Sequence, residues 1–181
     1  MPQDRRTLLA SAAGAGLLSG AEAAQKERPS FETLDRAAAR PVLRLEGLRA
    51  PVRIAGLELL HWNRRFLVRA RSTDGTEAII VPNEDRMRDV YPVFLHRIAP
   101  FFVGKDAREL EALLQELYRE GSNYKFQGLA LWVCVAAAEF ALLELLGKAS
   151  GKPLTDLLGG ARRREIAIYR ASGNRGNTPE Q

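Results

Sequence analysis

One long apolar stretch limits how this chain can fold more than any other feature. Between residues 129 and 146 the only charged residues are Glu139 and Glu144. A helix that is apolar on all sides either crosses a membrane or lies at the centre of a larger body. A membrane span needs about 20 apolar residues, and each carboxylate near its middle costs about 2.5–3.5 kcal/mol. We therefore expect a buried helix that is packed on two sides, and not a membrane span.

The residues that follow this helix interrupt the chain sharply. Gly151 can adopt the left-handed conformation that ends a helix, and Pro153 cannot continue one. Residues 153–158 predict one or two further helical turns, closed by Gly159 and Gly160. After this break, the alternation of β-branched and aromatic side chains over residues 165–171 predicts a strand.

The last residues predict the start of another element. Thr178 is a suitable N-cap, and Pro179 suits the first position of a helix. A strand followed by the start of a helix is half of a repeating unit. We therefore expect these residues to belong to a larger fold.

Before the long helix, the pattern predicts a sheet. Residues 52–60 indicate a strand, residues 61–65 a short turn, and residues 66–71 a second strand in which apolar and basic side chains alternate. Residues 73–76 contain Gly75 and indicate a tight hairpin turn, because glycine tolerates positive φ. Residues 77–81 complete an antiparallel meander of three strands.

Helices are predicted on either side of this sheet. Residues 30–39 indicate a short polar helix, residues 82–90 an irregular charged connection, and residues 91–100 an apolar helix. Asp106 followed by Glu109 is typical of a capping box. The helix after it has one apolar face, made by Leu110, Leu113, Leu114, Leu117 and Tyr118. Three strands followed by three or four helices predict an α+β fold, a meander beside a helical bundle.

The N-terminus predicts export. Arg5 and Arg6 precede fifteen uncharged residues, and residues 21–23 (Ala-Glu-Ala) offer a cleavage site. Residues 1–23 resemble a twin-arginine signal, so we expect a periplasmic protein; an amphipathic or disordered Ala-rich tail is the alternative. Residues 24–51 are then a linker or extension. The net charge is +5, but the basic residues are interleaved with acidic ones and show no aromatic stacking pattern. We therefore expect neither nucleic acid nor, once the signal is cleaved, a membrane as a partner.

The run A-x-x-E-F-A-L-L-E-L-L-G-K-A-S-G-K-P-L-x-x-L-L-G-G, whose first glutamate is Glu139, carries a family resemblance. It resembles the N-terminal capping domain of the enolase superfamily, and within it the mandelate racemase and muconate lactonizing enzyme group. The hairpin over residues 66–75 is a weaker marker, and the resemblance covers residues 52–172. Two structural positions depart from the family: residues 143–144 are Leu-Glu instead of Trp-Asp, and residues 77–80 are not Gly-Trp-Gly-Glu.

The resemblance implies one part of a two-domain enzyme. Residues 52–160 would be the capping domain, and residues 161–181 the first strand and the start of the first helix of a β/α barrel. In that family the barrel holds Mg²⁺ on three acidic side chains, and a lysine removes a proton next to a carboxylate. The implied reactions are racemisation, dehydration and cycloisomerisation of a small acid sugar or hydroxy acid. The implied assembly is a homo-oligomer.

None of this catalytic apparatus can be placed in the sequence, so we expect no catalytic residue, no metal ligand and an inactive fragment. The family's capping loops contact substrate, and here they would be residues 61–65 and residues 82–88. Arginine forks in such loops bind carboxylates, although a solvated surface charge is the simpler interpretation for each. The substrate-side candidates are Arg65, Asn83, Arg86, Arg88, Ser172 and Asn174.

Other polar residues invite a functional interpretation that we do not favour. His61, in a turn, and His96, in a helix, are expected to be surface or packing residues. Cys134 is expected to be a small buried apolar residue. Glu139 and Glu144 are expected to bond arginines or helix ends across an interface, not to act as an acid–base pair. The alternative to an enzyme domain is a free-standing interaction or dimerisation module.

Overall fold

The computed structural model describes residues 28–121 and 126–168, in two units divided after Arg40. The first unit contains helix α1 (Phe31–Ala38), as the polar pattern predicted. Ser30 caps this helix, because its hydroxyl accepts the backbone N–H of Thr33 at 3.2 Å. The helix has no buried residue. The predicted export signal, residues 1–23, lies outside the described residues.

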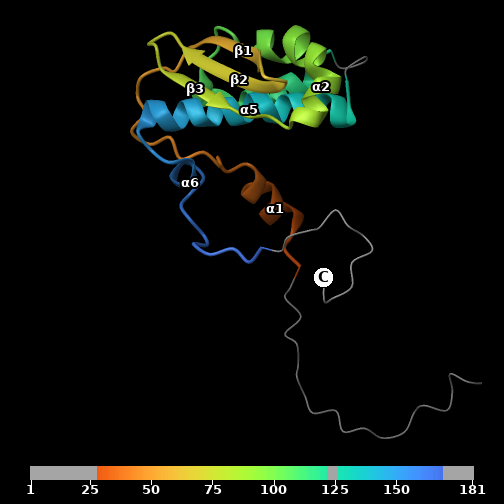
Figure 1. Cartoon of the computed structure of the whole chain (residues 1–181). Coiled ribbons are helices and arrows are strands. Elements are labelled where there is room, and N and C mark those ends of the chain that lie inside the picture. Colours follow the sequence, from red (N-terminus) through yellow and green to blue (C-terminus); the bar gives the residue numbers. More distant parts are fainter. Residues whose placement is uncertain (1–27, 122–125, 169–181) are drawn as a thin grey trace, which may run out of the picture. The chain divides into compact units, whose positions relative to one another are not determined.

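The second unit begins with the predicted three-stranded meander (Figure 1). Strands β1 (Ile54–Trp62), β2 (Arg65–Ser72) and β3 (Glu77–Ile80) are antiparallel and lie in that order. The inner face of the sheet carries apolar side chains in register across the strands. Its members are Leu57, Leu59, Val68, Ala70, Ala78 and Ile80.

The outer face of the sheet is held by a network of charges. The Nε of Arg69 lies 2.6 Å from one carboxylate oxygen of Glu58, and the Nη2 of Arg71 lies 2.8 Å from the other. Arg69 also reaches Glu77 at 3.7 Å. The hydrogen bond from Arg69 is the main reason that the pKa of Glu58 is lowered. This network explains the basic residues that alternate with apolar ones along β2.

The first hairpin turn is shorter than predicted. Of residues 61–65, His61 and Trp62 belong to β1 and Arg65 to β2, which leaves only Asn63 and Arg64 in the turn. Both have positive φ, 47° and 67° respectively. Two such residues match the right-handed twist of the flanking strands, but Arg64 is an unusual choice for this conformation. The second turn agrees with the prediction, with Gly75 at φ 92°.

The predicted irregular connection at residues 82–90 is wrong. Helix α2 (Glu84–Val93) occupies most of it, and the side chain of Asn83 caps the helix by accepting the N–H of Arg86 at 3.1 Å. Two acidic residues in the first turn favour the positive end of the helix dipole. Met87 is completely buried and fixes this helix to the core. The sequence did not predict this helix because many of its residues are charged.

The apolar helix predicted at residues 91–100 exists but is not regular. Pro92 lies inside α2 and lacks the N–H that would bond the carbonyl four residues earlier. The chain then continues as a π-helix, η1 (Phe94–Ile98), and as α3 (Ala99–Phe102). Phe94, Ile98 and Phe102 are almost fully buried, so this irregular stretch belongs to the core.

The capped amphipathic helix is confirmed. Asp106 caps the short 3-10 helix η2 (Ala107–Glu109), which leads into α4 (Leu110–Arg119). One face of this run packs inward, and its buried members are Leu110, Leu113 and Leu117. The aromatic ring of Tyr118 stacks on Trp132 of the next helix, with 5.5 Å between ring centroids.

Helix α5 (Gly128–Ser150) is the predicted central helix. It packs against the inner face of the sheet and against α2, η1 and α4. It ends at Gly151, whose φ is 66°, and is followed by the short helix α6 (Leu154–Leu157). Among the described residues α5 alone is long and apolar enough to cross a membrane, but 56% of its most apolar window is buried inside the protein. We interpret it as a core helix.

The predicted strand at residues 165–171 is not formed in the part that the structure describes. Residues 165–168 have no strand partner, and Ile166 and Ile168 are exposed. A strand needs a neighbour for its backbone N–H and C=O groups, and the described part of the chain provides none here. Residues 169–171 and the predicted helix start at Thr178 lie outside the described residues.

Candidate functional site

Two connections meet at one end of the sheet. In an antiparallel meander, the turn after β1 and the connection after β3 lie at the same end. Arg65, at the start of β2, lies with its Nε 3.8 Å from the carboxylate of Glu84, in the first turn of α2. This exposed ion pair contributes at most about 1 kcal/mol. It nevertheless brings one predicted candidate to the start of the helix that carries two others.

The other substrate-side candidates do not lie together in one loop. The side-chain oxygen of Asn83 is committed to capping α2. Arg86 and Arg88 are on a helix and not in a loop; both are exposed, on either side of buried Met87. Within the described residues neither arginine forms an ion pair. Ser172 and Asn174 lie outside the described residues.

An apolar groove adjoins this end of the sheet. It has a volume of about 350 Å³ and is lined by residues 80–83 and by the outer side of α5. No charged residue lines it. We call the apolar residues that α5 contributes, other than Ala137, the α5 stripe: Leu129, Trp132, Val133, Ala136 and Phe140.

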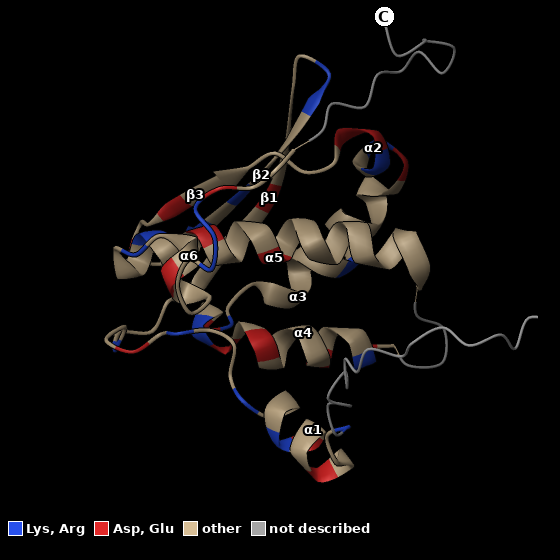
Figure 2. Cartoon of the chain, turned by 90° about the horizontal axis from the view of Figure 1, so that it is seen from below, with Lys and Arg blue, Asp and Glu red and all other residues tan. Residues whose placement is uncertain are grey.

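The α5 stripe is strongly exposed for an apolar surface. Leu129 is 66% exposed, Trp132 50% and Phe140 57%. In Figure 2, α5 is almost uncharged along its length, whereas α1, α2 and α4 carry charges of both signs. The sequence predicted a buried helix, but this side of α5 is uncovered in the described part of the chain. Contiguous apolar surface of this kind is typical of an interface.

A second hollow, of about 380 Å³, lies between the first hairpin and α2. His61 lies in β1, not in a turn, and its ring centroid is 5.1 Å from that of Phe66. The Phe66 ring in turn stacks on Tyr91 at 6.2 Å. Leu59 and Leu95 complete the lining. Sequence reasoning missed this cluster because it placed His61 in the turn and so ended the alternation of β1 too early.

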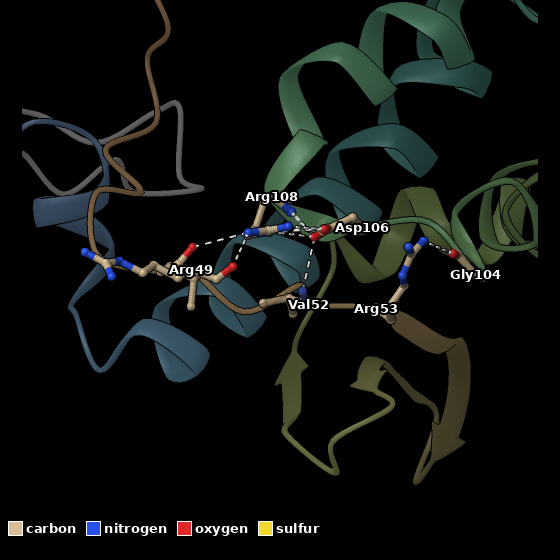
Figure 3. Close-up of polar contacts among 7 residues, drawn as sticks. Arg49, Val52, Arg53, Gly104, Asp106 and Arg108 are labelled. Atoms are coloured by element: carbon tan, nitrogen blue, oxygen red, sulfur yellow. Dashed lines mark hydrogen bonds and ion pairs between the residues drawn. The ribbon is translucent and has the colours of Figure 1, made fainter.

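A buried polar cluster connects the segment before β1 with the start of α4 (Figure 3). Asp106 is only 7% exposed, and its carboxylate accepts the N–H of Val52 at 3.1 Å. Arg108 donates to the same carboxylate and to the carbonyl of Arg49, at 2.7 Å from each. Each polar group has a partner, so this cluster is part of the framework and not of a reactive site.

The other polar residues named in the sequence analysis do not lie together in one site. Cys134 is buried, and burial raises the pKa of its thiol to about 11, as expected for a small core residue. Glu144 lies 4.0 Å from Lys148, so its partner is a lysine of the same helix and not the expected arginine. Glu139 is partly buried, and burial raises the pKa of its carboxyl. His96 is exposed on η1.

The described residues contain no group of three or more His, Cys, Asp or Glu side chains that could hold a metal ion. What the described part of the chain offers at the end of the sheet is therefore cationic side chains beside an apolar groove. Such a surface can bind an anion and pack against another domain.

Comparison with known proteins identifies the family to which this fold belongs. Residues 44–159 match the family model "Mandelate racemase / muconate lactonizing enzyme, N-terminal domain". A D-galactonate dehydratase of Xanthomonas axonopodis pv. citri (strain 306) is 38% identical over 90 residues, which are 50% of this chain and 23% of that protein. The chain spans about a fifth of the length of the curated relatives it matches, among them D-galactonate and D-mannonate dehydratases.

One solved structure supports the fold, and a second shows a weaker likeness. A protein of Roseobacter denitrificans described as a racemase candidate matches with a TM-score of 0.51 and 26% identity, over 60% of this chain and 29% of that one. A mandelate racemase/muconate lactonizing protein of Paracoccus denitrificans PD1222, solved with magnesium, matches with a TM-score of 0.49 and 26% identity, over 62% of this chain and 31% of that one.

Proposed function

Because the chain belongs to the mandelate racemase / muconate lactonizing enzyme family, as its N-terminal domain, we propose that it is the substrate-selecting cap of an acid-sugar enzyme. The reaction would be dehydration or racemisation, begun by removal of the proton next to a carboxylate. The catalytic barrel would be a second domain that packs against the capping domain, and the capping domain alone would be inactive.

The α5 stripe is the observation that carries this proposal. A core helix that buries one side and exposes Leu129, Trp132 and Phe140 on the other has an unfinished interface. The groove beside it contains residues 81–83, which belong to the connection expected to approach the substrate. A domain that covered the α5 stripe would therefore also lie against this connection.

The chemistry would be divided between the two bodies. Mg²⁺ held in the barrel would supply positive charge against the negative charge that develops on the substrate when the α-proton leaves. The described residues do not fit such an ion, since they contain no cluster of three acidic side chains. We therefore assign the metal ligands and the base to the barrel, and no step in proton transfer to the described residues of this chain.

The role left to this chain is recognition of the substrate. Arg65, Arg86 and Arg88 are exposed cations at or next to the sheet end that adjoins the groove. Guanidinium groups bind carboxylates through two parallel hydrogen bonds. We assign to them attraction of the acid sugar, with Arg65 held toward α2 by Glu84. A homo-oligomer of the complete enzyme is part of the same proposal.

A chimera tests the function. The N-terminal domain of the Xanthomonas D-galactonate dehydratase would be replaced by this chain, and D-galactonate and D-mannonate dehydration measured with Mg²⁺. We expect activity that Phe140→Glu lowers at least tenfold. Ile79→Glu, at a residue of similar exposure (48%) on the outer face of the sheet, is the control and should leave activity unchanged.

Two results would contradict the proposal. One is a folded, assembled chimera that has no activity on any acid sugar. The other is equal loss of activity from Phe140→Glu and Ile79→Glu, because the α5 stripe would then not be the domain interface. A defined dimer that Phe140→Glu leaves intact in size-exclusion chromatography would favour the interaction module instead.

We also propose export through the twin-arginine pathway, on the basis of Arg5 and Arg6 before an uncharged segment. Fractionation of cells that express the chain should place it in the periplasm, shortened by about 23 residues. Replacing both arginines by lysine should retain the uncleaved chain in the cytoplasm. Uncleaved wild-type chain in the cytoplasm would disprove this assignment.

A further inference from the structure

Glu139 has an unusual position on α5. It lies at the border between the α5 stripe and the seam with α4, and lines a pocket of about 170 Å³. The pocket walls include Leu114 and Leu143, and Leu158 at the end of α6. Glu139 has no hydrogen bond or ion pair with any residue that the structure describes. It is thus a partly buried anion among apolar side chains.

This arrangement is costly unless a cation completes it. An ionised carboxylate loses hydration when apolar groups surround it, and only a charged or hydrogen-bonding partner restores that loss. The nearby carboxylate of Glu111 cannot help, since it is an anion and accepts the N–H groups of Val42 and Leu43 at 2.7 and 2.6 Å. The pocket therefore favours the binding of a positively charged group.

Two cations of the surrounding elements are already engaged. Lys148 lies C-terminal to Glu139 on the same helix, α5. Its Nζ donates to the carbonyl of Glu77 at 3.0 Å and lies 4.0 Å from the carboxylate of Glu144. Arg108 is held by Asp106. These groups would have to leave existing partners in order to reach Glu139.

Three exposed arginines follow the pocket wall directly in sequence. Leu158 lines the pocket, and the basic cluster 162–164, three consecutive arginines, begins four residues later. Helix α6 is fixed beside the pocket, because the carbonyl of buried Leu157 accepts the N–H of Arg44 at 2.7 Å. Four extended residues span up to about 14 Å, so the cluster starts within reach of Glu139.

We propose that the pocket at Glu139 is the docking site for a guanidinium group of the basic cluster 162–164. The contact would fix the direction in which the chain leaves α6. Arginine suits the site because its planar fork pairs with a carboxylate through two hydrogen bonds while its stem packs on leucines. The contact involves this chain alone and does not depend on the proposed enzymatic role.

A double-mutant cycle tests the contact. Glu139→Gln is combined with the replacement of all three arginines of the basic cluster by glutamine, and the unfolding equilibrium of the full chain is measured in urea at pH 7. We expect Glu139→Gln to favour unfolding in the native background and to oppose it when the arginines are absent. The two effects should differ at least fivefold in the unfolding constant.

Glu144→Gln is the matched control on the same helix. Its effect should be the same in both backgrounds, because Glu144 faces Lys148. Equal effects of Glu139→Gln in the two backgrounds, within twofold, would overturn the proposal.

Zero-length cross-linking provides a second measurement that does not require reversible unfolding. Arg162→Lys, Arg163→Lys and Arg164→Lys are treated singly with a carbodiimide, which joins a carboxylate to a contacting amine. Peptide mapping should find Glu139 joined to at least one of the introduced lysines. Arg88→Lys, on exposed α2, is the control and should not join Glu139. Links to other carboxylates without any at Glu139 would refute the contact.

Discussion

Arg108 folds back onto Asp106, two residues earlier in the chain, so that its Nη2 lies 2.7 Å from Oδ2 of the carboxylate. The same carboxylate caps η2 and accepts the N–H of Val52, 54 residues away in sequence. Two local residues thus hold the start of the sheet against the start of α4. The cluster contributes to the fold rather than to chemistry.

Asp106→Ala should destabilise the protein by about 2–3 kcal/mol. The substitution removes a helix cap and leaves the buried N–H of Val52 without a partner. Equilibrium unfolding in urea measures the change. Glu109→Ala, at an exposed residue of the same turn, is the control and should change stability by less than about 0.5 kcal/mol. Equal effects would contradict the role given to Asp106.

The same residue should make stability depend on acid pH. The hydrogen bond from Arg108 is the main reason that the pKa of Asp106 is lowered. A carboxyl whose pKa is lower in the folded state stabilises the fold above its unfolded pKa of about 3.9. This contribution is lost as pH falls from there through the folded pKa. Urea midpoints from pH 7 to pH 2.5 should therefore fall less for Asp106→Asn than for wild type.

Arg64→Gly should stabilise the protein by about 0.5–1 kcal/mol. Arg64 adopts φ 67° in a two-residue turn, and Asn-Gly is the favoured pair for such a turn. Thermal unfolding checks the direction. Arg88→Gly, inside α2, is the opposite control and should cost about 0.5–1 kcal/mol. A destabilised Arg64→Gly variant would mean that the Arg64 side chain contributes more than its backbone strain costs.

Cys134 should resist alkylation in the folded protein. Burial raises the pKa of its thiol to about 11, which leaves roughly one thiol in a thousand ionised at pH 8. Iodoacetamide labelling followed by mass spectrometry should be at least a hundredfold slower than for an exposed cysteine introduced as Arg88→Cys. Addition of guanidinium chloride should abolish the difference. Rapid labelling of the native chain would show that the core around α5 opens.

The purified chain should self-associate through the α5 stripe when no barrel is present. Leu129 is 66% exposed on this apolar surface, and association removes such area from water. Sedimentation velocity should show species larger than a monomer, reduced by Leu129→Glu. Val103→Glu, at an exposed apolar residue before η2, is the control and should not reduce them. A monodisperse wild-type monomer would contradict this expectation.

The sequence could predict features that depend on neighbouring residues. The hairpin at Gly75, the end of α5 at Gly151 and the cap at Asp106 follow from local backbone and side-chain preferences. The start of α2 was also readable from Asn83 followed by two acidic residues. It was missed because the charged face and Pro92 hid the helical period.

Other features depend on residues far apart in the chain, and only the tertiary structure decided them. The pairing of Asp106 with Val52, and the aromatic contact between Phe66 and Tyr91, join segments whose separation no local period encodes. The same is true of the two sides of α5. Its sequence determined that the helix is apolar all round, but packing against the sheet decided that Ala138 is buried and Phe140 exposed. Apolar character is a property of each side chain, whereas burial depends on which neighbours the fold brings to it.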